Sequence, residues 1–239
     1  MLEKLTDRVY YLPYERYRDR PTLGYIRGDR FALQVDAGSS ADHVKLMQKA
    51  LGHLPQPQMA IMTHAHWDHT YGIHAFPGVT LATRATQAIL LEMSAWRWTP
   101  ADVARRIALG QDMLFCYDAI LKEYDDFSQI QVQPADIAFE GTLKMDLGRC
   151  PVEIIPLENS HLADCSVIYL PSEGVVFLGD ISYEDLLPQP PRYYLNKHQA
   201  LMAGLENLSF EYCVPGHHEV MTRRALFQEL EEIEKTLRF

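Results

Sequence analysis

Short apolar runs rich in β-branched and aromatic residues alternate with turn residues along the first third of the chain. Such runs predict strands, and five are present: VYYLP (9–13), TLGYI (22–26), FALQVD (31–36), MAIMT (59–63) and VTLAT (79–83). Gly28-Asp29 is a hairpin signal between the second and third runs. A helix is predicted from a cap at Ser40 through Leu51, because its apolar positions fall roughly on one face.

The pattern changes between residue 84 and about residue 126, where apolar positions recur at helical spacing. The stretch TPAD (99–102) predicts a helix start, because Thr can cap the helix, Pro suits its first position and Asp its first turn. The spacing that follows favours a partly buried pair of helices, broken near Gly110.

Strand-like runs return after residue 135: DIAFE (136–140), TLKMD (142–146), VEIIPL (152–157), CSVIYL (165–170) and VVFLGD (175–180). Residues 200–208 are predicted to be helical, FEYCVPG (210–216) to begin as a strand, and 222–237 to form a closing amphipathic helix. Strands followed by helix thus occur twice, with no linker between the halves. We therefore expect one α/β domain over residues 1–239, with two sheets face to face and a helical insert around 84–126.

Composition and charge narrow the classes of partner. The 239 residues include 22 basic and 32 acidic side chains, a formal charge of −10, which argues against general nucleic-acid binding. No apolar stretch reaches the roughly 18 residues of a membrane span, and the first residues show no secretory signal. The four scattered cysteines include no CxxC pair, which suits a reducing compartment. We expect a cytoplasmic protein with a small-molecule substrate and neither nucleic acid nor membrane as partner; the oligomeric state is left open.

The stretch THAHWDH (63–69) gathers three imidazoles and a carboxylate directly after an apolar run. Imidazole and carboxylate are the ligands expected for zinc-like ions. A turn after a strand can aim side chains at positions i, i+2 and i+5 at one point, and His64, His66 and His69 have this spacing, with Asp68 among them. The motif therefore predicts a metal site; the alternative is a chance cluster on a polar loop.

Three further candidates stand where strands of the second half end. His161 follows VEIIPLENS, Asp180 ends VVFLGD and His217 follows EYCVPG. Strand ends are where sites of α/β sheets are built. Each residue alone would be an ordinary polar loop residue, but their order after the histidine motif predicts a centre with two metal ions.

With these motifs in place, the chain resembles the metallo-β-lactamase superfamily from LQVDAG (33–38) to VPGHH (214–218), and THAHWDH resembles its signature motif. The resemblance implies a four-layer αβ/βα sandwich of two facing mixed sheets with outer helices, and metals at one edge between the sheets. It also implies a structural role for Asp36. It implies these ligands: His64, His66 and His161 for the first metal, Asp68, His69 and His217 for the second, and Asp180 as the bridge.

Two departures affect this assignment. The third ligand lies in SHLADC (160–165), whereas many members have GHTPG there. His218 directly follows His217, so the sequence leaves open which of the two binds, although the PGH pattern favours His217.

Two zinc-like cations lower the pKa of a shared water, which gives a hydroxide that attacks carbonyl carbon or phosphorus. We expect a hydrolase of a small ester, lactone or thioester that uses a metal-bridging hydroxide, with Asp68 orienting it or acting only as a ligand. The expected cofactors are two divalent ions, Zn²⁺ first, with Fe or Mn as alternatives. The resemblance puts a bridging Asp in thioesterase, lactonase and nuclease branches, and a carboxylate at the place of His66 in oxygen-reducing members.

Two alternatives remain open. A phosphodiesterase of the same fold would need cationic groups near the metals, and Arg97, Arg105 and Arg106 are the cluster available. A diiron redox protein is the other alternative.

Aromatic residues point to an apolar substrate. Hydrolases of acyl-homoserine lactones have an Asp-x-x-Tyr like DISY (180–183), which makes Tyr183 a candidate catalytic residue; a structural tyrosine is the alternative. The predicted helical insert carries Trp96, Trp98, Phe115 and Tyr117, which either overhang the metals, as the resemblance implies, or pack in the core.

Overall fold

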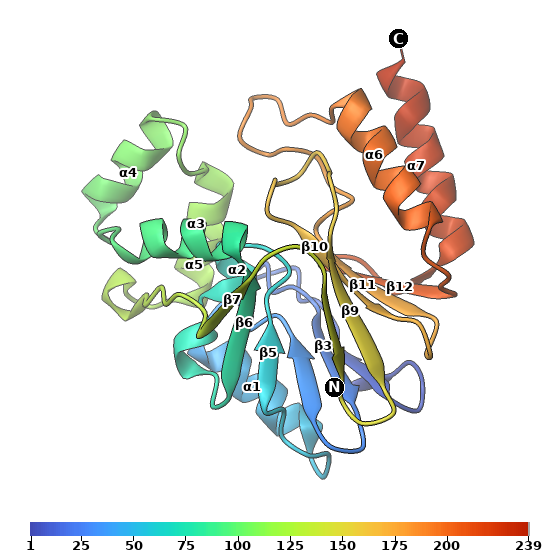
Figure 1. Ribbon diagram of the computed structural model, residues 1–239. Helices are drawn as coiled ribbons and strands as arrows, with labels where there is room; N and C mark the ends of the chain where they lie inside the picture. Colours follow the sequence, from blue (N-terminus) through green and yellow to red (C-terminus); the bar gives the residue numbers. More distant parts are fainter. Residues whose placement is uncertain (239) are drawn as a thin grey trace.

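In the computed structural model, which describes residues 1–238, the strands form two sheets that face each other, with helices outside them (Figure 1). The first sheet has the order β1-β2-β3-β4-β5-β6-β7. Its strands are β1 (Glu3–Lys4), β2 (Val9–Leu12), β3 (Leu23–Arg27), β4 (Ala32–Val35), β5 (Met59–Ile61), β6 (Val79–Thr83) and β7 (Ile137–Phe139). The pairs from β1 to β4 are antiparallel and those from β4 to β7 are parallel, so the sheet is mixed.

The second sheet has the order β13-β12-β11-β10-β9-β8. Its strands are β8 (Leu143–Asp146), β9 (Pro151–Pro156), β10 (Ser166–Leu170), β11 (Val175–Gly179), β12 (Tyr212–Pro215) and β13 (Met221–Thr222). β11 and β12 are parallel and the other pairs are antiparallel, so this sheet is mixed as well.

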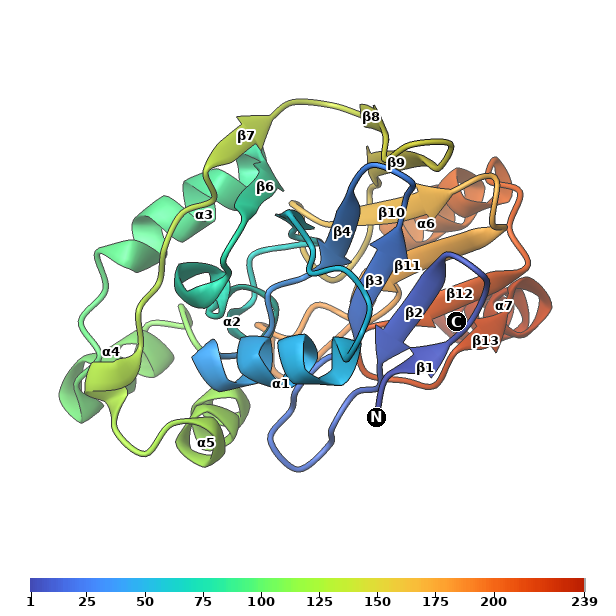
Figure 2. The ribbon, with the colours of Figure 1, turned by 90° about the horizontal axis from the view of Figure 1, so that it is seen from below.

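Helices cover the outer faces. They are α1 (Ala41–Leu51), α2 (Trp67–Thr70), α3 (Arg84–Ser94), α4 (Pro100–Ala108), α5 (Leu114–Glu123), α6 (Leu195–Glu206) and α7 (Arg223–Leu237), with single 3-10 turns η1 (Ile73–Ala75) and η2 (Phe127–Gln129). The side chains of Met47 and Leu51 on α1 pack against the first sheet. Leu201 on α6 and Leu226 on α7 pack against the second. The helices α3, α4 and α5 lie together, on the side away from α6 and α7 (Figure 1 and Figure 2).

The largest buried cluster joins the inner faces of the two sheets. Ile26, Leu33 and Ile61 of the first sheet meet Ile154 and Phe177 of the second, all of them at most 2% exposed. This core has helix, sheet, sheet and helix as successive layers, which confirms the predicted four-layer αβ/βα sandwich.

Most predicted elements are present within a few residues of their expected bounds. Ser40 caps α1 by accepting from the His43 N–H at 3.1 Å, and Thr99 caps α4 by accepting from the Asp102 N–H at 3.2 Å. The helical pair is α4 and α5, and Gly110 between them has a left-handed φ of 67°.

Two points differ from the sequence analysis. The DIAFE run was grouped with the strands of the second half, but β7 pairs in parallel with β6, Leu81 opposite Ile137, and so belongs to the first sheet. Helix α6 begins at Leu195 rather than near residue 200, because its first turn, LNKHQ, is helical without an apolar stripe. No helix within residues 1–238 is long and apolar enough to cross a membrane.

Candidate metal centre

The loop after β5 is held by the carboxylate of Asp36 at the end of β4. Asp36 has a left-handed φ of 61°. Its Oδ1 accepts from the Thr63 N–H at 2.7 Å, and its Oδ2 accepts from His69 Nδ1 at 2.7 Å. This carboxylate therefore fixes both the start of the histidine motif and the orientation of one imidazole, which is the structural role expected for Asp36. Outer partners of this kind orient metal-binding imidazoles.

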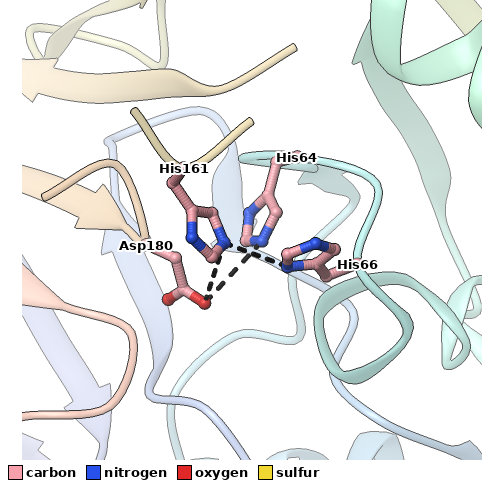
Figure 3. Close-up of side chains that lie close together, drawn as sticks. All are labelled: His64, His66, His161 and Asp180. Atoms are coloured by element: carbon pink, nitrogen blue, oxygen red, sulfur yellow. Dashed lines mark hydrogen bonds and ion pairs between the residues drawn. The ribbon is translucent and has the colours of Figure 1, made fainter. Parts of the chain in front are cut away.

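Four side chains from distant parts of the chain form a first group: His64, His66, His161 and Asp180 (Figure 3). His161 Nε2 lies 3.0 Å from His66 Nδ1. Asp180 Oδ2 lies 3.8 Å from His64 Nε2 and 3.7 Å from His161 Nε2. Each residue offers a ligand atom within 4.8 Å of the others, a spacing that suits a single ion between them.

A second group shares Asp180 with the first and adds Asp68, His69 and His217. Asp180 Oδ1 lies 3.4 Å from His69 Nε2, and Asp180 Oδ2 lies 3.5 Å from His217 Nε2. Asp68 Oδ2 lies 3.3 Å from His69 Nε2 and 2.9 Å from His217 Nε2. The structure thus brings all seven side chains expected from the sequence into two adjoining groups that meet at one carboxylate.

The choice between His217 and His218 is made by geometry. Within residues 1–238, His217 joins a group of candidate ligands, whereas His218 only lines the wall of the same cavity. Gly216 before them is necessary, because a Cβ added there would clash with Asp180 Oδ1. The PGH pattern therefore combines a side chain that faces the site with a glycine that makes room for Asp180.

His161 is in place although the glycines expected around it are missing. The Asn159 side chain donates to the carbonyl oxygens of Leu157 and Leu162 and accepts from the Leu162 N–H, each at 2.9 Å. His161 Nδ1 donates to Glu184 O at 2.8 Å, which leaves Nε2 as the free lone pair facing the site. The side chain of Asn159 therefore holds the turn that carries His161.

Several buried polar atoms fit a cation. His64 Nε2, His69 Nε2 and Asp180 Oδ1 are buried without a hydrogen-bond partner among the residues that the structure describes. An unpaired buried polar group costs about 1–3 kcal/mol. All three atoms point to the two groups, and imidazole with carboxylate is a donor set that zinc-like ions prefer. The residues present therefore fit divalent metal ions.

The histidine pKa values shift in opposite directions in the two groups. Burial, together with the neighbouring imidazoles, holds the pKa of His64 well below its usual range, and burial with His161 lowers the pKa of His66 to about 3. These rings are neutral and offer lone pairs. In the second group burial disfavours charge on His69, yet Asp180 and Asp68 raise its pKa well above the usual range. The carboxylates there favour positive charge, which a metal ion would supply.

Asp19 is a residue of the site that sequence analysis missed. It lies between β2 and β3 with a left-handed φ of 57°, and its Oδ1 lies 3.4 Å from His217 Nδ1. Burial and the charge of Asp68 raise its pKa to about 6. No apolar strand directly precedes Asp19, so no strand-end signal marks it in the sequence.

A buried ion pair holds the segment that carries Asp19. The guanidinium of Arg20 donates to both oxygens of Glu123, at 2.9 and 2.8 Å, and Ser40 donates to Glu123 Oε1. The end of α5, the loop with Asp19 and the start of α1 therefore meet at one carboxylate.

Tyr183 lies at the rim of the same cavity. Its hydroxyl oxygen accepts from the His217 N–H at 3.2 Å, so its own proton remains free to donate elsewhere. Burial and the charge of Asp180 raise the pKa of Tyr183, which keeps the phenol protonated. The other aromatics divide: Trp96 and Trp98 line a cavity beside His66, Phe115 lines the cavity of the candidate ligands, and Tyr117 packs against Phe127.

Comparison with known proteins agrees with this geometry. Residues 21–217 match the family model described as the metallo-beta-lactamase superfamily. The chain therefore belongs to the metallo-beta-lactamase superfamily, and its fold is the αβ/βα sandwich of that family.

Individual relatives are distant. The chain is 24% identical over 227 residues to the acyl-coenzyme A thioesterase MBLAC2 of Gallus gallus, covering 88% of this chain and 76% of that protein. A metallo-beta-lactamase from Pontibacter korlensis has a similar structure, with a TM-score of 0.69, 17% identity and 98% of each chain covered. The sec-alkylsulfatase Pisa1 from Pseudomonas sp. gives a TM-score of 0.71 at 15% identity; the match covers all of this chain but only 41% of Pisa1.

Proposed function

We propose that this protein is a metal-dependent hydrolase of a small ester, lactone or thioester, and that the two groups of side chains hold two divalent ions, Zn²⁺ first among them. Family membership and a thioesterase among the relatives indicate a hydrolase in general. The observation that carries the two-metal proposal is Asp180, whose oxygens lie 3.4–3.8 Å from imidazole nitrogens of both groups.

When bound, two such ions supply a nucleophile from water near neutral pH and polarise the carbonyl group under attack. The chain's own residues orient the reactants. Asp68 Oδ2 faces both His69 and His217, so this carboxylate is placed to accept a hydrogen bond from the attacking water. The overall reaction adds water across the acyl bond: the acyl carbon gains the oxygen, and the leaving oxygen or sulfur takes the proton.

Tyr183 is proposed as a hydrogen-bond donor to the carbonyl oxygen of the substrate. Its hydroxyl is fixed by the backbone of His217, next to the second group of ligands. A donor at this place would strengthen as negative charge builds on the oxygen, and would therefore act on turnover more than on binding.

The phosphodiesterase alternative has less support. Arg97, Arg105 and Arg106 line a hollow beside α4, and none of them lines the cavity of the candidate ligands in the described chain. A phosphate would therefore meet no guanidinium from this cluster near Asp180. By the family resemblance, oxygen-reducing members carry a carboxylate at the position of His66. The imidazole found here therefore favours hydrolysis over a diiron redox role.

The test combines elemental analysis with a substrate screen. Protein purified without chelator should carry close to two transition-metal ions per chain, and should hydrolyse at least one class among lactones, esters and thioesters. Bis-p-nitrophenyl phosphate and β-lactams serve as comparison substrates. Protein that carries no transition metal, or that turns over only the phosphodiester, would contradict the proposal.

A further inference from the structure

We infer that the cavity between the helices α3–α5 and the candidate metal centre binds the apolar acyl group of an uncharged substrate. This inference rests on the proposed function and adds what the sequence left open, namely the size and charge of the substrate.

The cavity has a volume of about 280 Å³ and is mainly apolar. Its walls come from α2 and the residues just before it, from α3 and α5 with the segments that connect them to α4, and from the loops after β9 and β11. The side chains that enclose it include Trp67, Tyr71, Met93, Trp96, Trp98 and Met113. Cavities lined by apolar side chains with a few polar groups are the usual sites for small ligands.

A second cavity, of about 260 Å³, adjoins the first and is lined by five of the seven candidate ligands: His66, Asp68, His161, Asp180 and His217. Both are lined by His66, His161, Trp67, Cys116 and Leu186, so the two cavities meet at the first group of ligands. His217 and Tyr183 line the cavity of the ligands and not the apolar one. A substrate whose carbonyl lies at the centre would therefore extend its acyl chain past His66 and His161, and its leaving group would lie on the side of His217.

Charge around both cavities argues against anionic substrates. No lysine or arginine lines either of them in residues 1–238, whereas Asp19 and Glu184 line the cavity of the ligands and Glu92, Asp112 and Asp185 line the apolar one. Apart from the histidines, the ionisable acidic and basic side chains that line the two cavities are all carboxylates, so an anionic group on the substrate would meet like charge there, which raises the free energy of the complex.

The guanidinium of Arg106, behind the aromatic wall, is already engaged. Arg106 is buried, its Cζ lies 4.5 Å from the ring centroid of Trp96 and 4.6 Å from that of Trp98, and its Nε lies 3.5 Å from Asp112. It supports the aromatic wall from behind and does not line the apolar cavity.

The volume sets the length of the acyl group. At roughly 30 Å³ for each small group, the share of a water molecule in the liquid, the cavity holds about nine carbon-sized groups. Burial of one methylene contributes about 0.8 kcal/mol, a factor of about four. We therefore expect kcat/KM to rise about fourfold per added carbon up to about eight to ten carbons, and then to fall.

Thioesters offer a matched test of both statements. N-acetylcysteamine thioesters from C2 to C14 are uncharged, and coenzyme A thioesters of the same acids carry phosphates. The metal-loaded protein should prefer the C8–C10 members of the first series, and should hydrolyse the corresponding coenzyme A thioester at least ~10-fold less efficiently, as like charges across a contact typically cost.

Variants identify the cavity. Met93→Trp should move the preferred chain to shorter acyl groups, and Met113→Ala should move it to longer ones; Met113→Trp repeats the first change from another wall if Met93→Trp fails to fold. The control is Leu91→Trp, on the same helix but 55% exposed and outside the cavity, which should leave the chain-length profile unchanged.

A binding measurement gives a readout apart from activity. All three tryptophans of the chain line the apolar cavity, so their fluorescence should report 1-alkanols entering it, with affinity rising from C4 to about C9 and lost in Met93→Trp. Hydrolysis of short and long thioesters at equal rates, or preference for the coenzyme A series, would overturn this inference and leave the proposed function standing. Failure to hydrolyse any acyl substrate would overturn both.

Discussion

The candidate metal centre and the helices α3–α5 lie side by side but are built in opposite ways. The ligands come from loops at strand ends and from the short helix α2. Almost all of them are buried, and Asp36, Glu184 O and Thr63 orient their side chains through hydrogen bonds. The helices beside them expose large apolar side chains, among them Leu109, Leu114 and Phe115, each 61% exposed.

This difference suggests that the candidate metal centre serves the chemical reaction, whereas the helices α3–α5 serve the choice of substrate. Hydrogen-bonded side chains on a sheet edge hold fixed geometry, as metal binding requires. The amphipathic helices α3–α5 lie beside this sheet edge, so substitutions of their side chains can leave the geometry of the ligands unchanged. Substitutions in the first region should therefore alter metal content, and those in the second should alter the choice of substrate.

The largest effect is expected at Asp180. Replacement by Ala removes the carboxylate shared by both groups, so kcat/KM should fall at least ~10³-fold, beyond the ~10²–10³ typical for loss of one oxyanion donor. Metal content, measured by elemental analysis, should fall with it. Asp180→Asn should keep the fold, by circular dichroism, but bind the second ion weakly. Full metal occupancy with full turnover in Asp180→Ala would contradict the bridging assignment.

Tyr183→Phe tests a residue of the same region that belongs to neither group of candidate ligands. We expect turnover to fall by up to ~10², with KM and metal content nearly unchanged, because the phenol would act only as charge develops on the carbonyl oxygen. The control is Tyr193→Phe, at a neighbouring wall. Wild-type turnover in Tyr183→Phe would leave only a packing role for the ring.

Asp19→Ala should weaken the second ion selectively. Loss of an outer hydrogen-bond partner of a metal-binding histidine typically costs 10–100-fold in metal affinity, and Asp19 faces His217 Nδ1. Competition with a chromogenic chelator should show one weakened site and one unchanged site. Equal loss at both sites would mean that Asp19 acts on the whole loop instead.

Arg106→Met addresses the helical region alone. Its guanidinium faces two indole rings and Asp112, so the free energy of unfolding should drop by about 2 kcal/mol, the scale of desolvated cation–π contacts. Thermal unfolding measures this, with exposed Arg105→Met on the same helix as control. Loss of metal in Arg106→Met would show that the two regions are not separable.

The last prediction is the absence of nucleic-acid binding. With a formal charge of −10, the protein should show no salt-dependent binding of RNA or DNA at micromolar concentration in fluorescence anisotropy. Binding that weakens as salt rises would show a nucleic-acid surface that the charge pattern did not indicate.

The same division decides what the sequence could predict. His64, His66 and Asp180 stand next to apolar strands, and strand ends gather at one edge, so the local pattern was sufficient to select them as candidates. Their grouping around shared ions came from the family resemblance. Asp19 lies on an irregular loop whose position depends on a contact with Glu123, 104 residues away from it in the chain, and no local pattern encodes such a contact.

Arg106 shows what the sequence pattern could not predict in the helical region. From the sequence, Arg97, Arg105 and Arg106 form one cationic cluster of the kind that a phosphodiesterase would need. In the structure Arg106 is buried against two neighbouring indole rings, because helix α4 packs this side chain on Trp96 and Trp98. Helical spacing predicted the helix but not the surface against which that face packs.

The ion pair of Arg20 with Glu123 also has a consequence for the order of folding. It joins residues 103 positions apart, and Ser40 reaches the same carboxylate across 83 positions. The entropy of closing such loops must be lost before these contacts contribute stability, which makes long-range contacts late and slow. The end of α5 should therefore dock only after the first strands have paired, so the wall of the apolar cavity is among the last parts of the molecule to become ordered.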